Sequence, residues 1–441
     1  MMITVQLLVV LAAIFLGARL GGIGIGFAGG LGVLVLALLG VTPGAMPLDV
    51  VSIIMSVIAA IAAMQVAGGM DYLVDLADRA LRRNPRYLNF LAPVITYLMT
   101  IMAGTGHTAF STMPVITEVA KENDIRPARP LSIAVVASQI AITASPISAA
   151  VVFFSGMLEE AGTGVDYITL LMVAIPSTFL ACMATAAIMM GIDKVRGTSK
   201  LSTLPEYQRR LEAGTVAPPT GRRSRELKKG ARLSVVVFCL GLLTVMTYAT
   251  IISDKVGLVA EPVMGRDAAI ISIMLGVAAV IVIVCRVQTA EILGASTFRS
   301  GMSASICVLG VAWLGTTFVK AHEEAILTAS GDLLRDHTWL LAVILVFAAA
   351  LLYSQAATSK ALMPLAVVAG VSPLGMVAAF PAVSALFILP TYPTLLAAVE
   401  MDDTGSTQIG RAIFNHPFLV PGLINIALAV ALGYGFGVLA I

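Results

Sequence analysis

Long apolar runs separated by short polar stretches recur along the whole chain of 441 residues. A run of about 18 or more apolar residues is long enough to cross a bilayer as a helix. The pattern predicts an all-α polytopic membrane protein with about 10 transmembrane helices. We expect these helices near residues 4–18, 20–42, 48–67, 130–155, 166–191, 231–252, 266–285, 301–319, 374–397 and 416–441.

Two further apolar segments, 88–122 and 338–370, are each interrupted by a polar stretch, "GTGHT" at 104–108 and "SQAATS" at 354–359. Basic residues precede and follow the first segment, in "DRALRRNPRY" and "RPAR". Because cytoplasmic loops are enriched in Lys and Arg, both ends of this segment are expected on the cytoplasmic side. We therefore interpret both segments as re-entrant hairpins, of which the second enters from the outer side.

The basic, Pro- and Gly-containing linker 193–230 divides the chain into two halves, 1–192 and 231–441. Each half is predicted to hold five spans and one hairpin, and an odd number of spans per half makes the halves inverted repeats. The stretch "TAFSTMPVI" (108–116) also matches "TSKALMPLA" (358–366), each in the second arm of its hairpin. With the linker on the cytoplasmic side, both chain termini are expected on the outer side.

Composition agrees with a membrane location and excludes several classes of protein. The chain is 59% hydrophobic and 12% charged, whereas soluble domains carry about 25% charged residues. No basic patch is interleaved with aromatic residues, so the lipid bilayer rather than nucleic acid is the expected partner. The four cysteines are widely spaced and the four histidines form no H-E-x-x-H motif. The sequence therefore predicts no metal, no cofactor and no enzymatic centre.

Each half also contains a proline-broken helix, at "TASPIS" and at "LPTYPT". Ser145 before Pro146 is expected to cap a new half-helix, and Thr108 and Thr358 stand where the second hairpin arms should begin. Half-helix N-termini present partial positive charge and free N–H groups, which secondary transporters use to bind anions. The alternative is that these are ordinary kinks and packing contacts. The candidate substrate contacts are Thr105, His107, Thr108, Ser145, Ser148, Thr358, Ser359, Lys360, Thr391 and Thr394.

Several candidates are ionisable. Lys360 would cost ~2.5 kcal/mol or more at the centre of a membrane helix, so it is either functional or extends its amine to the outer surface. His107 is either a hydrogen-bonded structural residue or a ligand contact. For Asp402 the alternatives are capping, pairing with Arg411 and proton transfer. The charges that are either interfacial or functional are Asp78, Arg82, Arg126 and Asp402.

The chain closely resembles the anaerobic four-carbon dicarboxylate (Dcu) transporter family in four stretches, "GTGHTAFSTMPVI", "RPARPLSIAVVASQIAITASPISAAVV", "LYSQAATSKALMP" and "LPTYPTLLAAVEMDDTG". The resemblance implies an ion-transporter-superfamily-like fold of the elevator type, a homodimer and a regulatory membrane partner. It also implies that a carboxylate and an arginine near Asp78 and Arg82, and the arginine at Arg126, are functional. Both hairpin turns lack the asparagine that sodium-coupled relatives carry.

The resemblance implies exchange of fumarate, succinate, malate and aspartate across the bacterial inner membrane, as fumarate–succinate antiport or as aspartate uptake. Other modes of transport stay open: a proton-coupled symporter, a uniporter or an anion channel. A membrane-embedded enzyme is the alternative from a different class, and it would need a nucleophile–base pair or a metal cluster.

Overall fold

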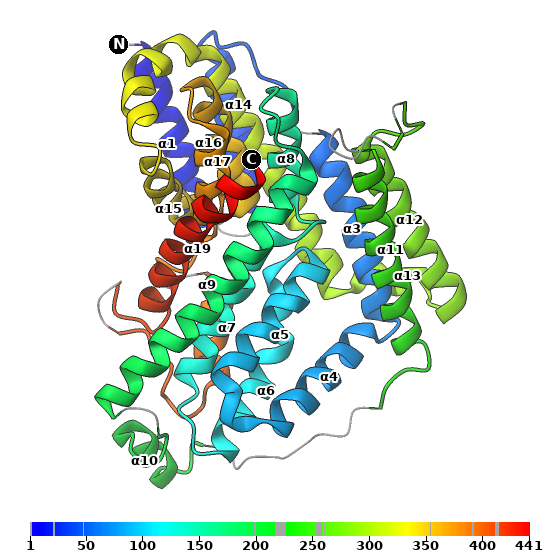
Figure 1. The fold of residues 1–441 in the computed structure, drawn as a ribbon, viewed down its shortest axis with the longest axis vertical. Helices are drawn as coiled ribbons and strands as arrows, with labels where there is room; N and C mark the ends of the chain where they lie inside the picture. Colours follow the sequence, from blue (N-terminus) through cyan, green and yellow to red (C-terminus); the bar gives the residue numbers. More distant parts are fainter. Residues whose placement is uncertain are drawn as a thin grey trace.

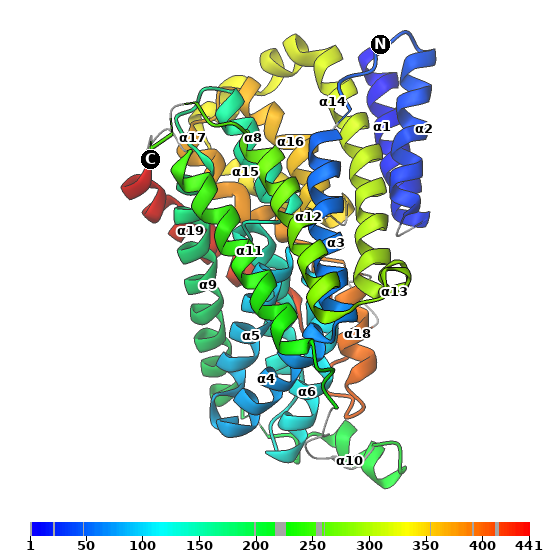
Figure 2. The same ribbon diagram turned by 90° about the vertical axis from the view of Figure 1, so that its right-hand side faces the viewer.

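The computed structural model describes residues 2–20, 23–46, 48–197, 200–216, 226–252, 258–259, 261–352, 354–389, 392–410 and 414–441. Regular secondary structure in these ranges is helical, apart from an isolated bridge between Ile125 and Lys200. Figures 1 and 2 show an elongated bundle with both chain termini in the half opposite the short helix α10 (Pro205–Glu212). The all-α expectation is therefore confirmed for the described chain.

Six described helical segments are long and apolar enough to cross a membrane. They are α7 to α8 (Ala128–Glu160), α9 (Tyr167–Arg196), α11 (Ala231–Ile251), α12 (Arg266–Cys285), the first part of α14 (Ser296–His322) and α19 (Leu419–Ala440). Shorter apolar helices include α1 (Met2–Leu20) and α2 (Gly24–Leu38). The number of ten spans stays a prediction.

A sharp bend separates α3 (Leu48–Val66) from α4 (Gly69–Arg83), with helix axes 71° apart. Gly68 lies at the bend with φ of 90°, a conformation that glycine adopts at little cost. One face of α4 is buried through apolar side chains such as Val74 and Leu81, while Arg79 on another face is exposed. α4 is therefore an amphipathic helix.

The span predicted near residues 301–319 is longer than expected, because α14 continues through the acidic stretch "AHEEAILTASGDLLRDH" to Asp336. The helix contains one residue with non-helical backbone angles, His322 (φ −127°, ψ 20°). The segment from Ala321 to Ser330 contains neither proline nor glycine, so no strong helix breaker stops the helix there.

Two helix–turn–helix segments occupy the predicted hairpin positions. The first comprises α5 (Leu88–Ala103), η2 (Gly106–Thr108) and α6 (Ala109–Glu122), and the second comprises α15 (Leu340–Leu352) and α16 (Gln355–Val368). Gly104 ends α5 with φ of 63°, which a glycine readily adopts. The re-entrant path of these hairpins and the inverted relation of the two halves stay predictions.

Each half also contains an interrupted helix. In the first half α7 (Ala128–Ile140) and η3 (Ala141–Ala144) are followed by a turn and by α8 (Ala149–Glu160). In the second half α17 (Pro373–Ala379) and η4 (Phe380–Ser384) precede a longer break before α18 (Pro393–Met401). The two breaks lie close together, because η3 packs against η4 and Phe154 of α8 stacks on Phe380 of η4 with ring centroids 4.5 Å apart.

The glycine-rich helix α2 packs directly on the backbone of α14. A Cβ atom on Gly26 would lie 2.3 Å from the carbonyl oxygen of Ile306, and one on Gly29 would lie 2.4 Å from the carbonyl carbon of Gly310. Gly30 has open space around it. The stretch "GIGFAG" (24–29) therefore packs closely on α14 through Gly26 and Gly29.

Candidate functional site

Helices from the two halves meet at Gln139 near the end of α7. Its Nε2 donates to Oγ1 of Thr394 on α18 at 3.2 Å, and its backbone carbonyl accepts from Nε2 of Gln355 on α16 at 3.3 Å. Gln355 is the first residue of α16 and Thr394 the second residue of α18. The N-termini of two half-helices are therefore joined to α7 through one buried glutamine. We call Gln139, Gln355 and Thr394 the glutamine junction.

The tip of the first hairpin rests against the first broken helix. A Cβ atom on Gly104 would lie 3.2 Å from the carbonyl oxygen of Ile147, and one on Gly106 would lie 3.0 Å from that of Ser138. At the tip, the hydroxyl oxygens of Thr108 and Thr100 are 3.1 Å apart. Thr108 is buried and Thr105 is half-buried. The structure thus places the predicted contacts of this tip beside the break in α7–α8, and the side chain of His107 lies outside the described part.

The first broken helix restarts at Ala149, so the expectation that Ser145 caps a helix beginning at Pro146 is wrong. Residues 145–148 form a turn in which the amide of Ser148 donates to the carbonyl of Ser145 at 3.1 Å, and proline is favoured at the second position of such turns. The actual N-cap is Ser148, whose Oγ accepts from the amide of Val151 at 3.2 Å. Ser145 instead donates to the carbonyl of Ile101 at 2.7 Å and ties the break to α5.

The second arm of the second hairpin, α16, begins before Thr358, where the match between residues 108–116 and 358–366 places its start. Ser354 caps α16 by accepting from the amide of Ala357 at 3.2 Å. Thr358 therefore lies inside the first turn rather than at the helix start, and its hydroxyl donates to the carbonyl of Ser354 at 2.8 Å. Ser359 donates likewise to the carbonyl of Gln355 at 2.8 Å. Both hydroxyl groups are buried, and each would have to exchange its present acceptor for a ligand oxygen in order to donate to that ligand.

Lys360 is buried, with 1% of its surface exposed. Its Nζ lies 5.4 Å from the centroid of the Phe153 ring on α8, within the range of a cation–π interaction. The alternative in which its amine extends to the outer surface is therefore wrong for this conformation. A buried lysine on the arm of the second hairpin adds positive charge near the N-terminus of α16.

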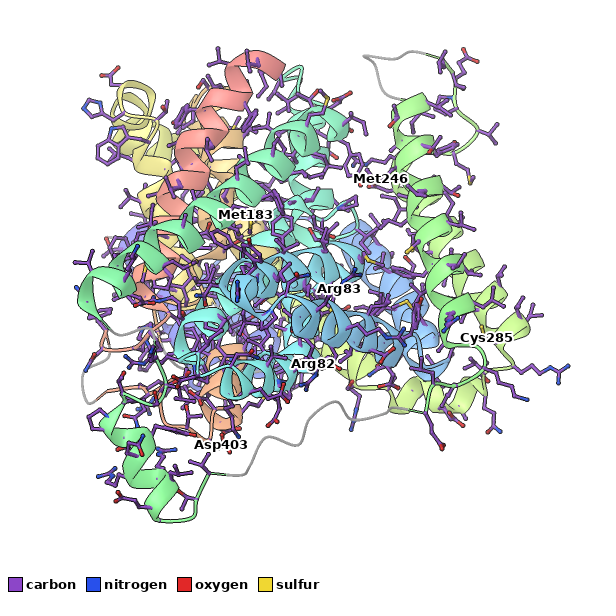
Figure 3. All side chains as sticks on the ribbon, turned by 60° about the horizontal axis from the view of Figure 1, so that its bottom comes forward. Arg82, Arg83, Met183, Met246, Cys285 and Asp403 are labelled. Carbon is purple, nitrogen blue, oxygen red and sulfur yellow. The ribbon has the colours of Figure 1, made fainter. Side chains whose placement is uncertain are left out.

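The other charged candidates lie at the end of the molecule where α10 is found, and Figure 3 shows Arg82 and Asp403 there. Arg82 bonds Asp78 through Nε at 2.8 Å and also pairs with Glu122 of α6. The buried Nε of Arg126 has no hydrogen-bond partner among the described residues. Arg82 thus connects α4 with the base of the first hairpin, away from its tip.

Asp402 is a capping residue for the loop after α18. Its carboxylate accepts from the amides of Thr404 and Thr407 at 3.1 and 2.7 Å and from the hydroxyl of Ser406 at 2.7 Å. Asp402 therefore caps this loop, as one of the alternatives predicted, and proton transfer stays a prediction. Pairing with Arg411 involves a residue outside the described part, and Thr391 also lies outside it. The neighbouring Asp403 pairs with Lys121 of α6, with two contacts of 3.0 Å.

Sequence reasoning did not find Gln139 and Gln355. A signal for both exists, because each is an isolated amide in a largely apolar or small-residue stretch, "VASQIAI" and "LYSQAAT". Polar residues at membrane depth are rare and are usually functional or paired.

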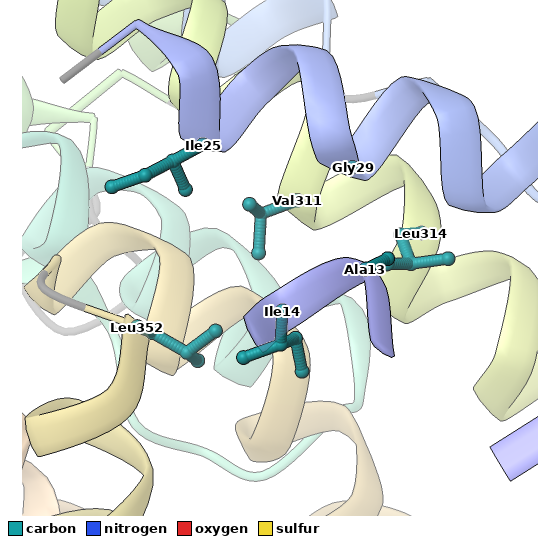
Figure 4. Close-up of a pocket in the computed structure, with 7 residues that line it drawn as sticks. All are labelled: Ala13, Ile14, Ile25, Gly29, Val311, Leu314 and Leu352. Carbon is teal, nitrogen blue, oxygen red and sulfur yellow. The ribbon is translucent and has the colours of Figure 1, made fainter. Parts of the chain in front are cut away.

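A pocket shown in Figure 4 lies elsewhere, between α1, α2, α14 and α15, and its lining is apolar: Ala13, Ile14, Ile25, Gly29, Val311, Leu314 and Leu352. This lining has no group that could pair with a carboxylate.

Comparison with known proteins matches the chain along its length. The family model described as anaerobic C4-dicarboxylate membrane transporter matches residues 2–441. The C4-dicarboxylate transporter DcuA of Wolinella succinogenes is 58% identical over 434 residues, which cover 98% of each chain. DcuA of Escherichia coli K12 is also 58% identical, over 99% of each chain. The anaerobic C4-dicarboxylate transporter DcuB of E. coli is 35% identical, over 99% of this chain and 98% of that one.

Among solved structures, the YdaH transporter of Alcanivorax borkumensis aligns with a TM-score of 0.52. The alignment covers 88% of this chain and 84% of the other, at 15% sequence identity, so it shows a similarity of fold. The relatives named above have higher sequence identity to this chain, and they are transporters rather than enzymes. The chain is a membrane transporter that belongs to the anaerobic C4-dicarboxylate transporter family.

Proposed function

We propose that the protein exchanges four-carbon dicarboxylates across the bacterial inner membrane, by fumarate–succinate antiport or in support of aspartate uptake. The observation that carries this proposal is the meeting of two helix N-termini, those of α16 and α18, at the glutamine junction. Two half-helices begin there, each contributing roughly +0.5 charge at its N-terminus, and the buried Lys360 follows on α16. A dianion has the charge that such a place would bind.

The helical arrangement supports an elevator mechanism. α3 packs against α12 and α14, and α14 packs against α2; Figure 2 shows these helices along one part of the bundle. We propose that they form a scaffold, while the two hairpins and the two broken helices form the moving part. In this proposal 1–192 and 231–441 are inverted repeats joined by the cytoplasmic linker 193–230, the termini are periplasmic, and two copies form a dimer through their scaffolds.

Transport by proteoliposomes containing the purified protein tests the exchange mode. Labelled succinate, fumarate, malate and aspartate are each offered outside, with and without unlabelled substrate inside. Exchange requires internal substrate and gives saturable counterflow. Uptake driven by an inward proton gradient into empty vesicles would instead indicate a symporter. Saturable uptake that requires neither internal substrate nor a proton gradient would indicate a uniporter. Flux without saturation or counterflow would indicate a channel.

We expect Thr108→Val and Thr358→Val each to weaken substrate binding by ~1–2 kcal/mol, as for a lost hydrogen bond to a charged group. The reason is their matching positions in the two similar stretches 108–116 and 358–366, near the hairpin tips, where each hydroxyl would exchange its present partner for one substrate carboxylate. Half-saturation concentrations in counterflow measure the effect. Thr112→Val is the matched control, because Thr112 lies one turn further along α6 and donates to the carbonyl of Ala109. Unchanged half-saturation in both variants would contradict the assignment.

A further inference from the structure

The side chain of Gln139 has a hydrogen-bonding group that the protein leaves unused. The residue is 1% exposed. Its Nε2 bonds Thr394 and its backbone carbonyl bonds Gln355, while Oε1 has no hydrogen-bond partner among the described residues. Buried polar atoms in folded proteins are nearly always paired, so an open acceptor at this depth points to a ligand that donates a hydrogen bond.

The position of this acceptor matters because its surroundings are otherwise positive. The N-termini of α16 and α18 meet at Gln139, and Lys360 lies on the same arm as Gln355. N-termini and a lysine attract the carboxylates of a dianion, but they offer nothing to a hydrogen-bond donor on the same molecule. An amide oxygen held among them supplies that missing acceptor.

We propose that Gln139 recognises the substituent at C2 of a four-carbon dicarboxylate, by accepting a hydrogen bond from an amino or hydroxyl group there. This inference rests on the proposed transport of dicarboxylates. Succinate and fumarate have no donor at C2 and leave Oε1 unpaired, whereas a 2-amino or 2-hydroxy dicarboxylate satisfies it. Thr394 positions the amide through its contact with Nε2, and Gln355 holds the backbone of Gln139 rather than its side chain.

The experiment compares four competitors against labelled-succinate counterflow in proteoliposomes: succinate, 2-methylsuccinate, malate and aspartate. Methylsuccinate fills the C2 position without a donor and therefore separates size from hydrogen bonding. For the unmodified protein we expect aspartate and malate to compete better than methylsuccinate. In Gln139→Met, which keeps the side-chain length and removes the amide, this advantage should fall by about tenfold, the loss of one hydrogen bond, while the ratio between methylsuccinate and succinate should stay the same.

Two further variants distinguish loss of the hydrogen-bond acceptor from a general effect on folding. Gln139→Glu keeps an acceptor at the same place and should retain the preference for aspartate over methylsuccinate. Gln355→Met removes a neighbouring amide but leaves Oε1 of Gln139 in place, and it should also retain the preference. Equal weakening of all four competitors in Gln139→Met, or an unmodified protein without a preference for the donors, would overturn the inference. Either result leaves dicarboxylate exchange intact, whereas absence of any succinate counterflow would contradict the proposed function itself.

Discussion

Lys360→Met is expected to lose at least tenfold in affinity for succinate, and its residual transport should no longer require internal substrate. The affinity falls because a charge-assisted contact to a carboxylate is lost. The change in coupling has an electrostatic reason. A bound dianion adds two negative charges beside Lys360, so the loaded and the empty carrier differ in net charge, and each charge moved across the membrane works against ~2.3 kcal/mol per 100 mV of membrane potential.

Counterflow and net uptake, measured in the same vesicles, distinguish binding from coupling. Lys121→Met is the matched control, because Lys121 is also a buried lysine but pairs with Asp403 at the base of the first hairpin. We expect that variant to keep its dependence on internal substrate. If Lys360→Met bound succinate normally and still required counter-substrate, Lys360 would not be the coupling charge.

Gly29→Ala is expected to destabilise the protein strongly, by ~1–3 kcal/mol or more. The added Cβ atom would lie 2.4 Å from the carbonyl carbon of Gly310, and a contact between two backbones cannot be relieved by rotating a side chain. α2 and α14 would have to separate. Thermal unfolding of the detergent-purified protein measures the loss.

The neighbouring Gly30 provides the control, since beyond its chain neighbours and its own helix backbone no atom of the described residues lies within 4 Å of a Cβ atom built there. Gly30→Ala should be neutral or stabilising by up to ~1 kcal/mol, because alanine favours the helix over glycine. Equal melting temperatures for the two variants would show that close packing of α2 on α14 does not limit stability.

The sequence by itself predicted the apolar helices and the places where they are interrupted. Hydrophobicity and the effects of glycine and proline are local, so they can be read from neighbouring residues. This is why the breaks at "TASPIS" and "LPTYPT" lie where the pattern put them, and why Lys360 was recognisable as an ionisable residue within an apolar segment. The family resemblance depended on the same local stretches.

Local patterns were less reliable for the residues that end and begin these helices. Ser145 and Ser148 are both acceptable caps, and the choice of Ser148 follows from the turn at Pro146 together with the bond from Ser145 to α5. The extension of α14 was missed for a related reason. The predicted span ends near residue 319, where the apolar run gives way to an acidic stretch, although the residues of that stretch favour a helix.

Only the tertiary structure decided which polar groups meet. Gln139 and Thr394 are 255 residues apart, and Lys121 and Asp403 are 282 residues apart, so no local pattern relates them. The structure also decided that Lys360 points into the protein towards Phe153 rather than to the surface. Sequence determines where a helix can form and break, because those preferences depend on adjacent residues. The partners of a buried polar side chain depend on how distant segments pack, and that is fixed only when the two halves fold against each other.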